Sequence, residues 1–514
     1  MKRDSLTFAR GVVILAAIIL LLVIVDIFVD VLGGRYPLAR LAAFDYNEAR
    51  FVVDVSNRGL NQLLALVFTV VAIAVPLTAN LYSLKFLELF IKDRINLAVL
   101  SLVVLTDLAS FWSIYSLKED FIPIFQLHAV FVLLILCLCV LFPYLLYVFN
   151  FLHPNTLLHR LEDEIDAGLR AAREQPARAA NHREVVGDGL EHIANIAVRS
   201  IERTDRDTAI ESVLALERVA RAYWGVKGSL PAAWFVADAD AFRGFSHKAV
   251  DELTTSRTWV EMKLLWQLRG ILSAAVPRTH DVADAAAKAL RHLGLEGPCR
   301  ADAALRDLVV DYFNTFMRLA LNRRDAHTVF TLLGDYRILA EEWNADYPDL
   351  VLEIAYYFQY YGQVARDSQL PFLVKAGAHD LGALVQHAWE TGAANRQKLL
   401  ERFLLYDLQD QSRLPGVVKA QAILASYFML AGQAEPLDQI RQSLAGLDPA
   451  FLAHVEDDLL HVKREKYWEI SERRMHIDYV PDAQREKLRE FFDQLLAGQA
   501  PERTLQQPPA AAPA

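Results

Sequence analysis

Long apolar runs, confined to the first 150 residues, are the most distinctive pattern along the chain. A bilayer core about 30 Å thick needs about 20 mainly apolar residues in a helix, because a helix satisfies its own backbone hydrogen bonds. Four runs reach this length. The sequence therefore predicts four transmembrane helices, at about residues 11–32, 60–82, 95–117 and 124–149.

The first run has an alternative interpretation as a signal peptide, since Met1-Lys2-Arg3 resembles a basic leader. The apolar run is longer than the hydrophobic part of a signal peptide, however. No small-x-small cleavage site follows Val29. These two features favour a membrane helix.

Four crossings place both ends of the chain on the same side of the membrane. Seven Lys and Arg residues flank the segments on that side, against five on the other. Because cytoplasmic loops carry the excess of basic residues, this count predicts that both termini are cytoplasmic. Residues 84–94 then form an amphipathic helix end at the cytoplasmic interface, with Lys85, Lys92 and Arg94 as interfacial residues.

One acidic residue, Asp107, falls in the middle of the third apolar run, beside Thr106 and Ser110. An aspartate at the bilayer centre costs about 2.5–3.5 kcal/mol on insertion scales, so it indicates a pore-lining or relay carboxylate, or an acid that fixes helix packing. Asn80 and Thr69 of the second run are candidate partners for packing. The absence of a second charge at similar depth in the sequence favours packing over transport.

From residue 155 onward, apolar residues recur at helical spacing and strand-like alternation is scarce. Thr204 to Asp207 has the form of a capping box that opens a helix. A break is expected at 225–245, around Pro231 and nearby glycines. The fold class is all-α, in four parts: a transmembrane domain (1–152), a membrane-proximal helical region (153–230), a helical-repeat domain (246–498) and a disordered tail (499–514).

An internal repeat supports a solenoid of helical hairpins between about residues 300 and 465. The segment AxYFxxxGQ at 355–363 recurs at 425–433, 70 residues later. The stretch 422–449 resembles a tetratricopeptide repeat. Helical arrays of this kind present extended surfaces to other proteins, whereas the alternative is an irregular helical bundle. Four residues are expected to end helices, with left-handed backbone at the glycines: Asn322, Gly362, Gly392 and Gly432.

Charge and motifs exclude several functions. Residues 1–150 hold eleven basic and eleven acidic residues, so the net charge of -10 lies in the remainder. An acidic soluble part argues against nucleic acid as a partner. Three cysteines form no disulfide framework, and the ten-residue spacing of His182 and His192 suits no helical metal site. Walker A, GxGxxG and HExxH motifs are absent from the sequence, so neither a catalytic residue nor a cofactor is predicted.

Two segments carry a resemblance to a known family. They are Phe90-Ile91-Lys92-Asp93-Arg94-Ile95-Asn96, and Ala197-Val198-Arg199-Ser200-Ile201 followed by Asp205-x2-Thr208-Ala209. With the order of membrane helices, they resemble a bacterial family of predicted membrane proteins of unknown function. The family pattern has Pro, Asn and Pro where this chain has Ile201, Thr204 and Arg206. The resemblance implies a membrane location and no known activity.

Our leading hypothesis is a bacterial inner-membrane protein whose cytoplasmic helical-repeat domain binds a protein partner as a scaffold or sensor. The alternative is an oligomeric ion channel or transporter whose third helix lines the pore. A membrane-bound enzyme is a third hypothesis and has no supporting constellation of residues. The expected partners are the lipid bilayer, a protein and, as a further hypothesis, other copies of the chain.

Overall fold

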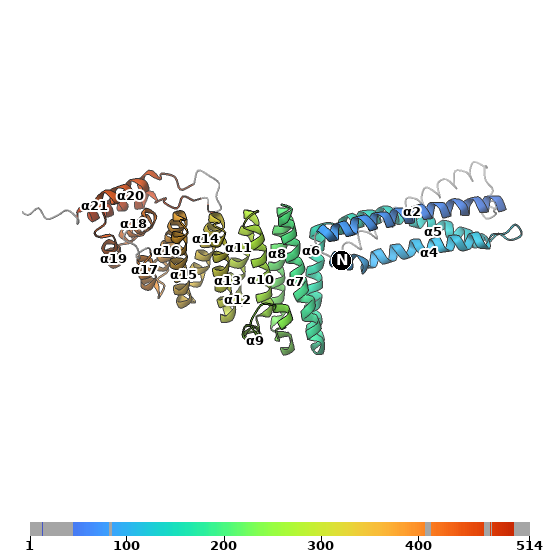
Figure 1. Cartoon of the computed structure of the whole chain (residues 1–514), viewed down its shortest axis with the longest axis horizontal. Coiled ribbons are helices and arrows are strands. Elements are labelled where there is room, and N and C mark those ends of the chain that lie inside the picture. Colours follow the sequence, from blue (N-terminus) through green and yellow to red (C-terminus); the bar gives the residue numbers. More distant parts are fainter. Residues whose placement is uncertain are drawn as a thin grey trace, which may run out of the picture. The chain divides into compact units, whose positions relative to one another are not determined.

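The computed structural model describes Val13 and residues 45–81, 85–406, 413–466, 473 and 475–497 (Figure 1). The chain divides into two compact units, Met1–Trp234 (unit 1) and Phe235–Ala514 (unit 2). Their boundary falls within residues 225–245, the stretch in which the sequence predicts a break. Across the described ranges the chain is all-α, and extended pairing is limited to the isolated bridges Lys118–Phe121 and Lys466–Met475.

Unit 1 contains three described helices that are long and apolar enough to cross a membrane: α2, α4 and α5. The third and fourth predicted segments match α4 and α5 closely. The first, at 11–32, lies outside the described residues apart from Val13, and so does the predicted tail. The helices of unit 1 are α2 (Tyr46–Leu81), α3 (Lys85–Ile91), α4 (Arg94–Ser116), α5 (Ile124–Phe151), α6 (Pro154–Glu174), α7 (Ala179–Glu202) and α8 (Arg206–Lys227).

Helix α2 begins at Tyr46, well before the predicted start at residue 60. The early part is amphipathic rather than uniformly apolar, so a search for apolar runs misses it. Ala49, Val53, Ser56 and Leu60 follow one another at helical spacing and are all buried. Ala49 and Val53 place the extra turns against the start of α5, because they pack in one cluster with Leu127.

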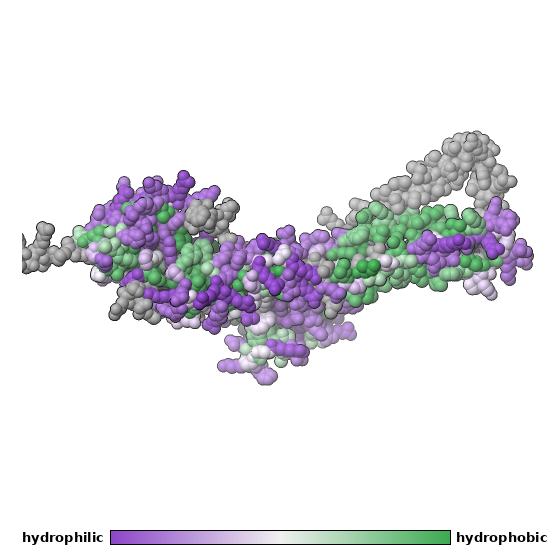
Figure 2. All heavy atoms as spheres, turned by 45° about the horizontal axis from the view of Figure 1, so that its top comes forward, coloured by the Kyte–Doolittle hydropathy of each residue, from purple (hydrophilic) through white to green (hydrophobic). Residues whose placement is uncertain are grey.

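The three membrane helices share a core near their middle, where Leu60 of α2, Val103 of α4 and Cys137 of α5 pack together. Large apolar side chains cover their outer surface, and Figure 2 shows this apolar belt over α2, α4 and α5. Phe125 is 88% exposed and Leu105 is 64% exposed. Side chains of this kind are stable in contact with lipid and unfavourable in water, which agrees with a transmembrane bundle.

Helices α6, α7 and α8 form a three-helix bundle directly after α5. Gly189 of α7 permits the close approach of α6, because a β-carbon there would lie 2.5 Å from a side-chain carbon of Ile165. The predicted capping box is shifted by one residue. Asp205 is the N-cap of α8 and accepts from the Thr208 N–H, whereas Thr204 has left-handed backbone (φ 60°). Thr204 follows the end of α7, where the Asp205 N–H donates to the Ser200 carbonyl, as in a Schellman motif.

Unit 2 is an array of helical hairpins in two layers. Short turns join the members of each pair, and helices begin at Asp N-caps such as Asp325 or at a first-turn proline such as Pro371. Its helices are α9 (His247–Ser256), α10 (Trp259–Ala275), α11 (His280–Leu295), α12 (Gly297–Ala301), α13 (Ala303–Asn322), α14 (Ala326–Trp343), α15 (Pro348–Asp367), α16 (Pro371–Glu390), α17 (Arg396–Leu404), α18 (Pro415–Leu430), α19 (Ala434–Leu444), α20 (Pro449–His461) and α21 (Asp482–Ala497).

We name the two layers by their helices. Layer A consists of α11, α14, α16 and α18, each packed on the next, and α21 packs on α18. Layer B consists of α10, α13, α15 and α17 in the same order. Figure 1 shows the helices of unit 2 standing in this row. This is the solenoid-like, helical-hairpin architecture expected from the sequence, while the likeness of 422–449 to a tetratricopeptide repeat stays a prediction.

Three of the four predicted helix ends are correct, and only Gly362 is wrong. Gly392 and Gly432 follow α16 and α18 with φ of +68° and +67°. Asn322 is the last residue of α13, whereas Gly362 lies inside α15. The prediction for Gly362 is wrong because this glycine makes room for a neighbour. A β-carbon there would lie 2.2 Å from the hydroxyl of the buried Tyr406.

Candidate functional sites

The polar residues predicted inside the membrane lie on one buried face of α4. Thr106 and Ser110 are fully buried, and Asp107 is 9% exposed. The Thr106 hydroxyl donates to the Leu102 carbonyl and accepts from the Cys137 thiol of α5 at 3.5 Å. Asp107 Oδ1 and Ser110 Oγ are buried and lack a hydrogen-bond partner among the described residues. The structure therefore gathers three of the predicted polar residues on a single face.

The two partners proposed for Asp107 are engaged differently. Thr69 donates to the Ala65 carbonyl of its own helix. The Asn80 residue is exposed, and its backbone carbonyl accepts a hydrogen bond from Arg199. Within the part of the chain that the structure describes, no hydrogen bond joins either residue to Asp107.

The three predicted interfacial residues lie from the first residue of α3 to the first residue of α4, and one of them, Lys85, contacts α6. Lys85 lies 3.1 Å from Glu88 and 3.2 Å from Glu164 of α6, while the exposed Lys92 pairs with Glu88 at 2.6 Å. Burial lowers the pKa of Lys85, but its two carboxylate partners outweigh burial and raise the pKa above its ordinary value. Arg94 is exposed at the start of α4.

A deeper ion pair joins the membrane helices to α6. Asp93 is the N-cap of α4, and its carboxylate accepts from the N–H groups of Ile95 and Asn96. The same carboxylate pairs with Arg160 of α6 at 3.0 Å, with the side chains of Arg160 and Asp93 only 12% and 7% exposed. Arg160 therefore binds the group that caps a membrane helix.

The Arg160 guanidinium also binds the end of α5. It donates to the Tyr147 hydroxyl at 2.9 Å and lies 3.9 Å from the centre of the Phe151 ring. One side chain thus connects the start of α4, the end of α5 and α6. Arg199 of α7 adds a similar contact, because it donates to the Asn80 carbonyl in the last turn of α2. A cation there complements the partial negative charge of a helix C-terminus.

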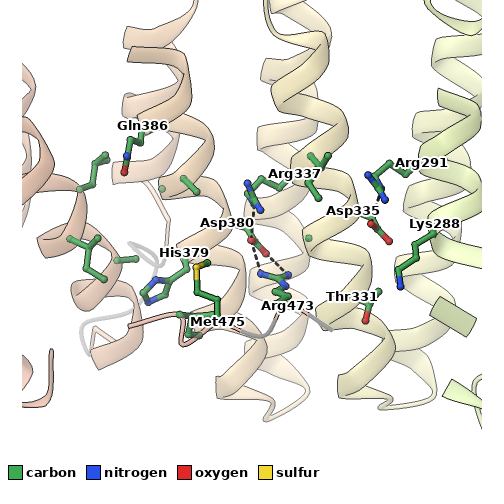
Figure 3. A pocket seen from close by; sticks show the side chains of 18 residues that line it. Lys288, Arg291, Thr331, Asp335, Arg337, His379, Asp380, Gln386, Arg473 and Met475 are labelled. Atoms are coloured by element: carbon green, nitrogen blue, oxygen red, sulfur yellow. Dashed lines mark hydrogen bonds and ion pairs between the residues drawn. The ribbon is translucent and has the colours of Figure 1, made fainter. Parts of the chain in front are cut away.

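Unit 2 contains a cavity of about 470 Å³, lined by all four helices of layer A and by the segment that follows α20 (Figure 3). Lys288 and Arg291 line it from α11. Arg291 pairs with Asp335 of α14 at 2.9 Å. Burial raises the pKa of Asp335, although Arg291 opposes this shift. The cavity has the size of a small-molecule or peptide side-chain site.

The segment that closes this cavity, which we name the arm, consists of Arg473 and residues 475–480. The Arg473 guanidinium binds the carboxylate of Asp380 in α16 through two hydrogen bonds of 2.7 and 2.8 Å. It also lies 3.9 Å from the centre of the Phe330 ring of α14. Arg337 of α14 shares Asp380 at 3.1 Å, and Figure 3 shows this acid between the two arginines.

A second contact of opposite sign holds the arm at Asp478, whose side chain is 5% exposed. Its carboxylate lies 2.5 Å from Lys375 and 3.2 Å from His379, both in α16, and 3.8 Å from Lys419 in α18. Burial alone would raise the pKa of Asp478, but His379 and Lys375 hold this pKa well below its usual range. His476 completes the local turn, because its Nδ1 accepts from the Asp478 N–H.

The described helices define the class of protein: an all-α membrane protein with extensive helical structure beyond its membrane helices. Residues 3–189 match the model of a family described as "Predicted membrane protein (DUF2254)". This match confirms the family resemblance drawn from the sequence. It ends inside α7, so the second segment of that resemblance, at 197–209, lies beyond it.

The other comparisons add little. No curated protein matches the chain. One solved structure that matches is described as a "Circular tandem repeat protein with novel repeat topology and enhanced subunit contact surfaces". It is 11% identical, with 88% of this chain and 97% of that chain covered and a TM-score of 0.32.

Sequence reasoning missed both the Arg160 contact and the arm. The partners lie far apart in the chain: 67 residues separate Arg160 from Asp93, and 93 separate Arg473 from Asp380. Asp93 offers a signal, since it precedes the apolar run of α4 as an N-cap residue. The arm has no such signal in the sequence, because an irregular stretch between two helices normally indicates a loop. Among the described residues, no cluster of three or more His, Cys, Asp or Glu side chains is arranged to hold a metal.

Proposed function

We propose that this protein is a membrane-anchored binding protein, in which α2, α4 and α5 hold the chain in a bacterial inner membrane and layer A of unit 2 binds a protein partner. The observation that carries the proposal is the arm, a non-helical peptide segment held by side chains of three successive helices of layer A. A surface that binds one such segment has the donors, acceptors and cavity to bind another.

Contacts within unit 1 support the orientation that we propose, with the soluble region in the cytoplasm. Lys85 and Asp93, in the segment between α2 and α4, contact Glu164 and Arg160 of α6. These contacts favour a topology in which residues 85–94 and the α6–α8 bundle face the same side of the membrane. The basic residues near that segment favour the cytoplasmic side.

Site-specific photo-crosslinking in cells tests partner binding. A photoreactive phenylalanine replaces Lys288, which is exposed on α11, or Gln386, which lines the cavity from α16. Lys398, exposed on α17 of layer B, is the matched control. We expect one discrete adduct from the two layer A positions, identified by the sequence of its cross-linked peptide. Equal labelling from Lys398, or no adduct from layer A, contradicts the proposal.

The buried polar face of α4 favours a second candidate function, an ion path through an oligomer. Asp107 Oδ1 and Ser110 Oγ are one helical turn apart and unpartnered among the described residues, an arrangement that suits a bound cation or proton. Ion flux into liposomes that contain the purified protein tests this function. If the liposomes show no ion flux and layer A still gives cross-links, the ion-path function is rejected and the binding function remains.

A further inference from the structure

Layer A holds the arm by two charged contacts that lie side by side on α16. Asp380 binds Arg473, and the preceding residue, His379, pairs with Asp478. Lys375 lies one turn away and pairs with the same aspartate. The layer therefore presents an acidic position next to a basic one. Their spacing matches an arginine and an aspartate five residues apart in a non-helical peptide.

Three features make the acidic position specific for arginine. Asp380 is 3% exposed and accepts both ends of the guanidinium fork, a geometry that lysine cannot reproduce. The Phe330 ring packs against the flat face of the same group. Gly334 leaves room for it, because a β-carbon there would lie 2.9 Å from Arg473 Nη2. A side chain on any other residue type at 334 would displace the guanidinium.

The basic position is specific for an acid. Asp478 contacts Lys375, His379 and Lys419, and Lys419 has a further acidic partner in Asp458 at 2.7 Å. Removing the arm without replacement would leave Asp380 with Arg337 alone and would take the acidic partner away from Lys375 and His379. Buried charges without partners are costly, so an incoming peptide must supply both charges.

Between its charged ends, the arm pairs with the segment that follows α20: Met475 forms a bridge with Lys466, and the His476 N–H donates to the Glu465 carbonyl. Met475, between the two contacts, is 46% exposed, although it lines the cavity. At the far end, Val480 is fully buried and anchors the arm to unit 2. The arm can therefore leave layer A while its Val480 end and α21 stay in place.

We propose that layer A recognises a non-helical segment of a protein partner that carries an arginine and, five residues later, an aspartate or glutamate, and that this segment displaces the arm. The inference rests on the proposed function and specifies its partner. Because the arm is tethered, its effective concentration at layer A is in the millimolar range, so it competes with any partner. The arm therefore sets a minimum affinity for layer A, which a partner must exceed in order to displace it.

A fluorescent peptide with the sequence of residues 471–482 (SERRMHIDYVPD) is the probe, and binding is measured by anisotropy with the full chain in detergent micelles. The double variant Arg473→Ala with Asp478→Ala frees both positions on layer A. We expect this variant to bind the peptide at least about tenfold more tightly than the wild type does. A control peptide with alanine in place of Arg473 and Asp478 should bind at least about tenfold more weakly than the parent peptide.

Equal affinities of the variant and the wild type, or of the two peptides, overturn the proposal. Unchanged helical content and a retained cooperative unfolding transition show that the double variant folds, even where its thermal midpoint is lower, and Asp478→Asn serves as a milder second variant. Dimers formed through exchanged arms, detected by light scattering, would identify a second copy as the occupant and also overturn it. If layer A gives cross-links but does not bind the peptide, partner binding stands and only this mode of recognition is rejected. If layer A binds the peptide but gives no cross-links in cells, the proposed partner is rejected.

Discussion

The contact between Arg160 and Asp93 offers the sharpest test of how the membrane helices are joined to the α6–α8 bundle. Asp93 has two roles: it caps α4 through the N–H groups of Ile95 and Asn96, and it pairs with the guanidinium. Asn replaces Asp well as an N-cap, so Asp93→Asn keeps the cap and removes the charge. Asp93→Ala removes both, and Arg160→Met removes the cation while keeping a long apolar side chain.

The burial of the pair sets the expected magnitude. Both side chains are largely excluded from water, and breaking such a pair on one side typically costs about 3–5 kcal/mol. We expect the loss of unfolding free energy in Asp93→Asn to be near the lower limit of this range, since asparagine still accepts a hydrogen bond from Arg160. Asp93→Ala should cost about 1 kcal/mol more, which is the typical contribution of an N-cap. Arg160→Met also loses the contacts with Tyr147 and Phe151, so its cost should be similar to that of Asp93→Ala.

Unfolding by denaturing detergent, followed by circular dichroism, gives the free energy of each variant, and the double variant Asp93→Asn with Arg160→Met completes a cycle. We expect a coupling energy of about 1.5–3 kcal/mol. The exposed pair Arg58–Asp54 is the matched control, with side chains 74% and 53% exposed, and Asp54→Asn should leave stability unchanged. A coupling energy below about 0.5 kcal/mol would show that the pair behaves like a surface ion pair and would refute the reasoning.

Four further tests concern single residues. Gly362→Ala should destabilise the protein by about 1–3 kcal/mol through overpacking, and Gly432→Ala by about 1 kcal/mol through strain at positive φ, so thermal unfolding should rank the first as worse. Thr204→Asn should raise the thermal midpoint, because asparagine tolerates left-handed backbone better than a β-branched residue, and a lower midpoint would contradict this. Burial, with nearby cations, lowers the pKa of His476 in the folded protein. The neutral ring therefore stabilises the docked arm above about pH 6.5, the ordinary histidine pKa. This stability is lost as the pH falls through the lower pKa of the folded state. Amide exchange at 475–480 should therefore rise between about pH 7.5 and 5.5 in the wild type and stay flat in His476→Gln. Asp107→Asn should change cation flux if α4 lines an ion path, and should leave both flux and stability nearly unchanged if the acid only packs.

Much of the fold was predictable because membrane helices and long amphipathic helices leave strong periodic signals. The bounds of α4 and α5 followed from length and hydropathy alone. The start of α2 did not, because Ala49 and Val53 are buried among polar residues on an amphipathic helix. Gly362 shows a different limit. A glycine that ends a helix and a glycine that admits a neighbouring ring look the same in a sequence, and only the position of Tyr406 separates them.

The candidate sites were predictable only where the chemistry lies within one segment. Thr106, Asp107 and Ser110 share a helix, so their common face followed from helical spacing. The Arg473 site depends on a glycine, an aromatic ring and an acid from two other helices. No local pattern encodes that combination, because each residue has an ordinary explanation in its own helix.

The two charged contacts differ in a way that bears on how the protein works. At Arg160 the ion pair is combined with an N-cap, a tyrosine hydroxyl and an aromatic ring, all supplied by membrane helices that cannot leave the bundle. A change in the tilt or separation of α4 and α5 is therefore expected to shift α6, because Arg160 of α6 contacts groups at the start of α4 and at the end of α5. At Arg473 and Asp478 both charged contacts of the arm can be reproduced by a peptide of the same charge pattern, so the charges on layer A stay paired when such a peptide replaces the arm. The proposed binding function requires rigid coupling at the first contact and exchange at the second, because the membrane anchor must stay fixed while the recognition surface stays open to a partner.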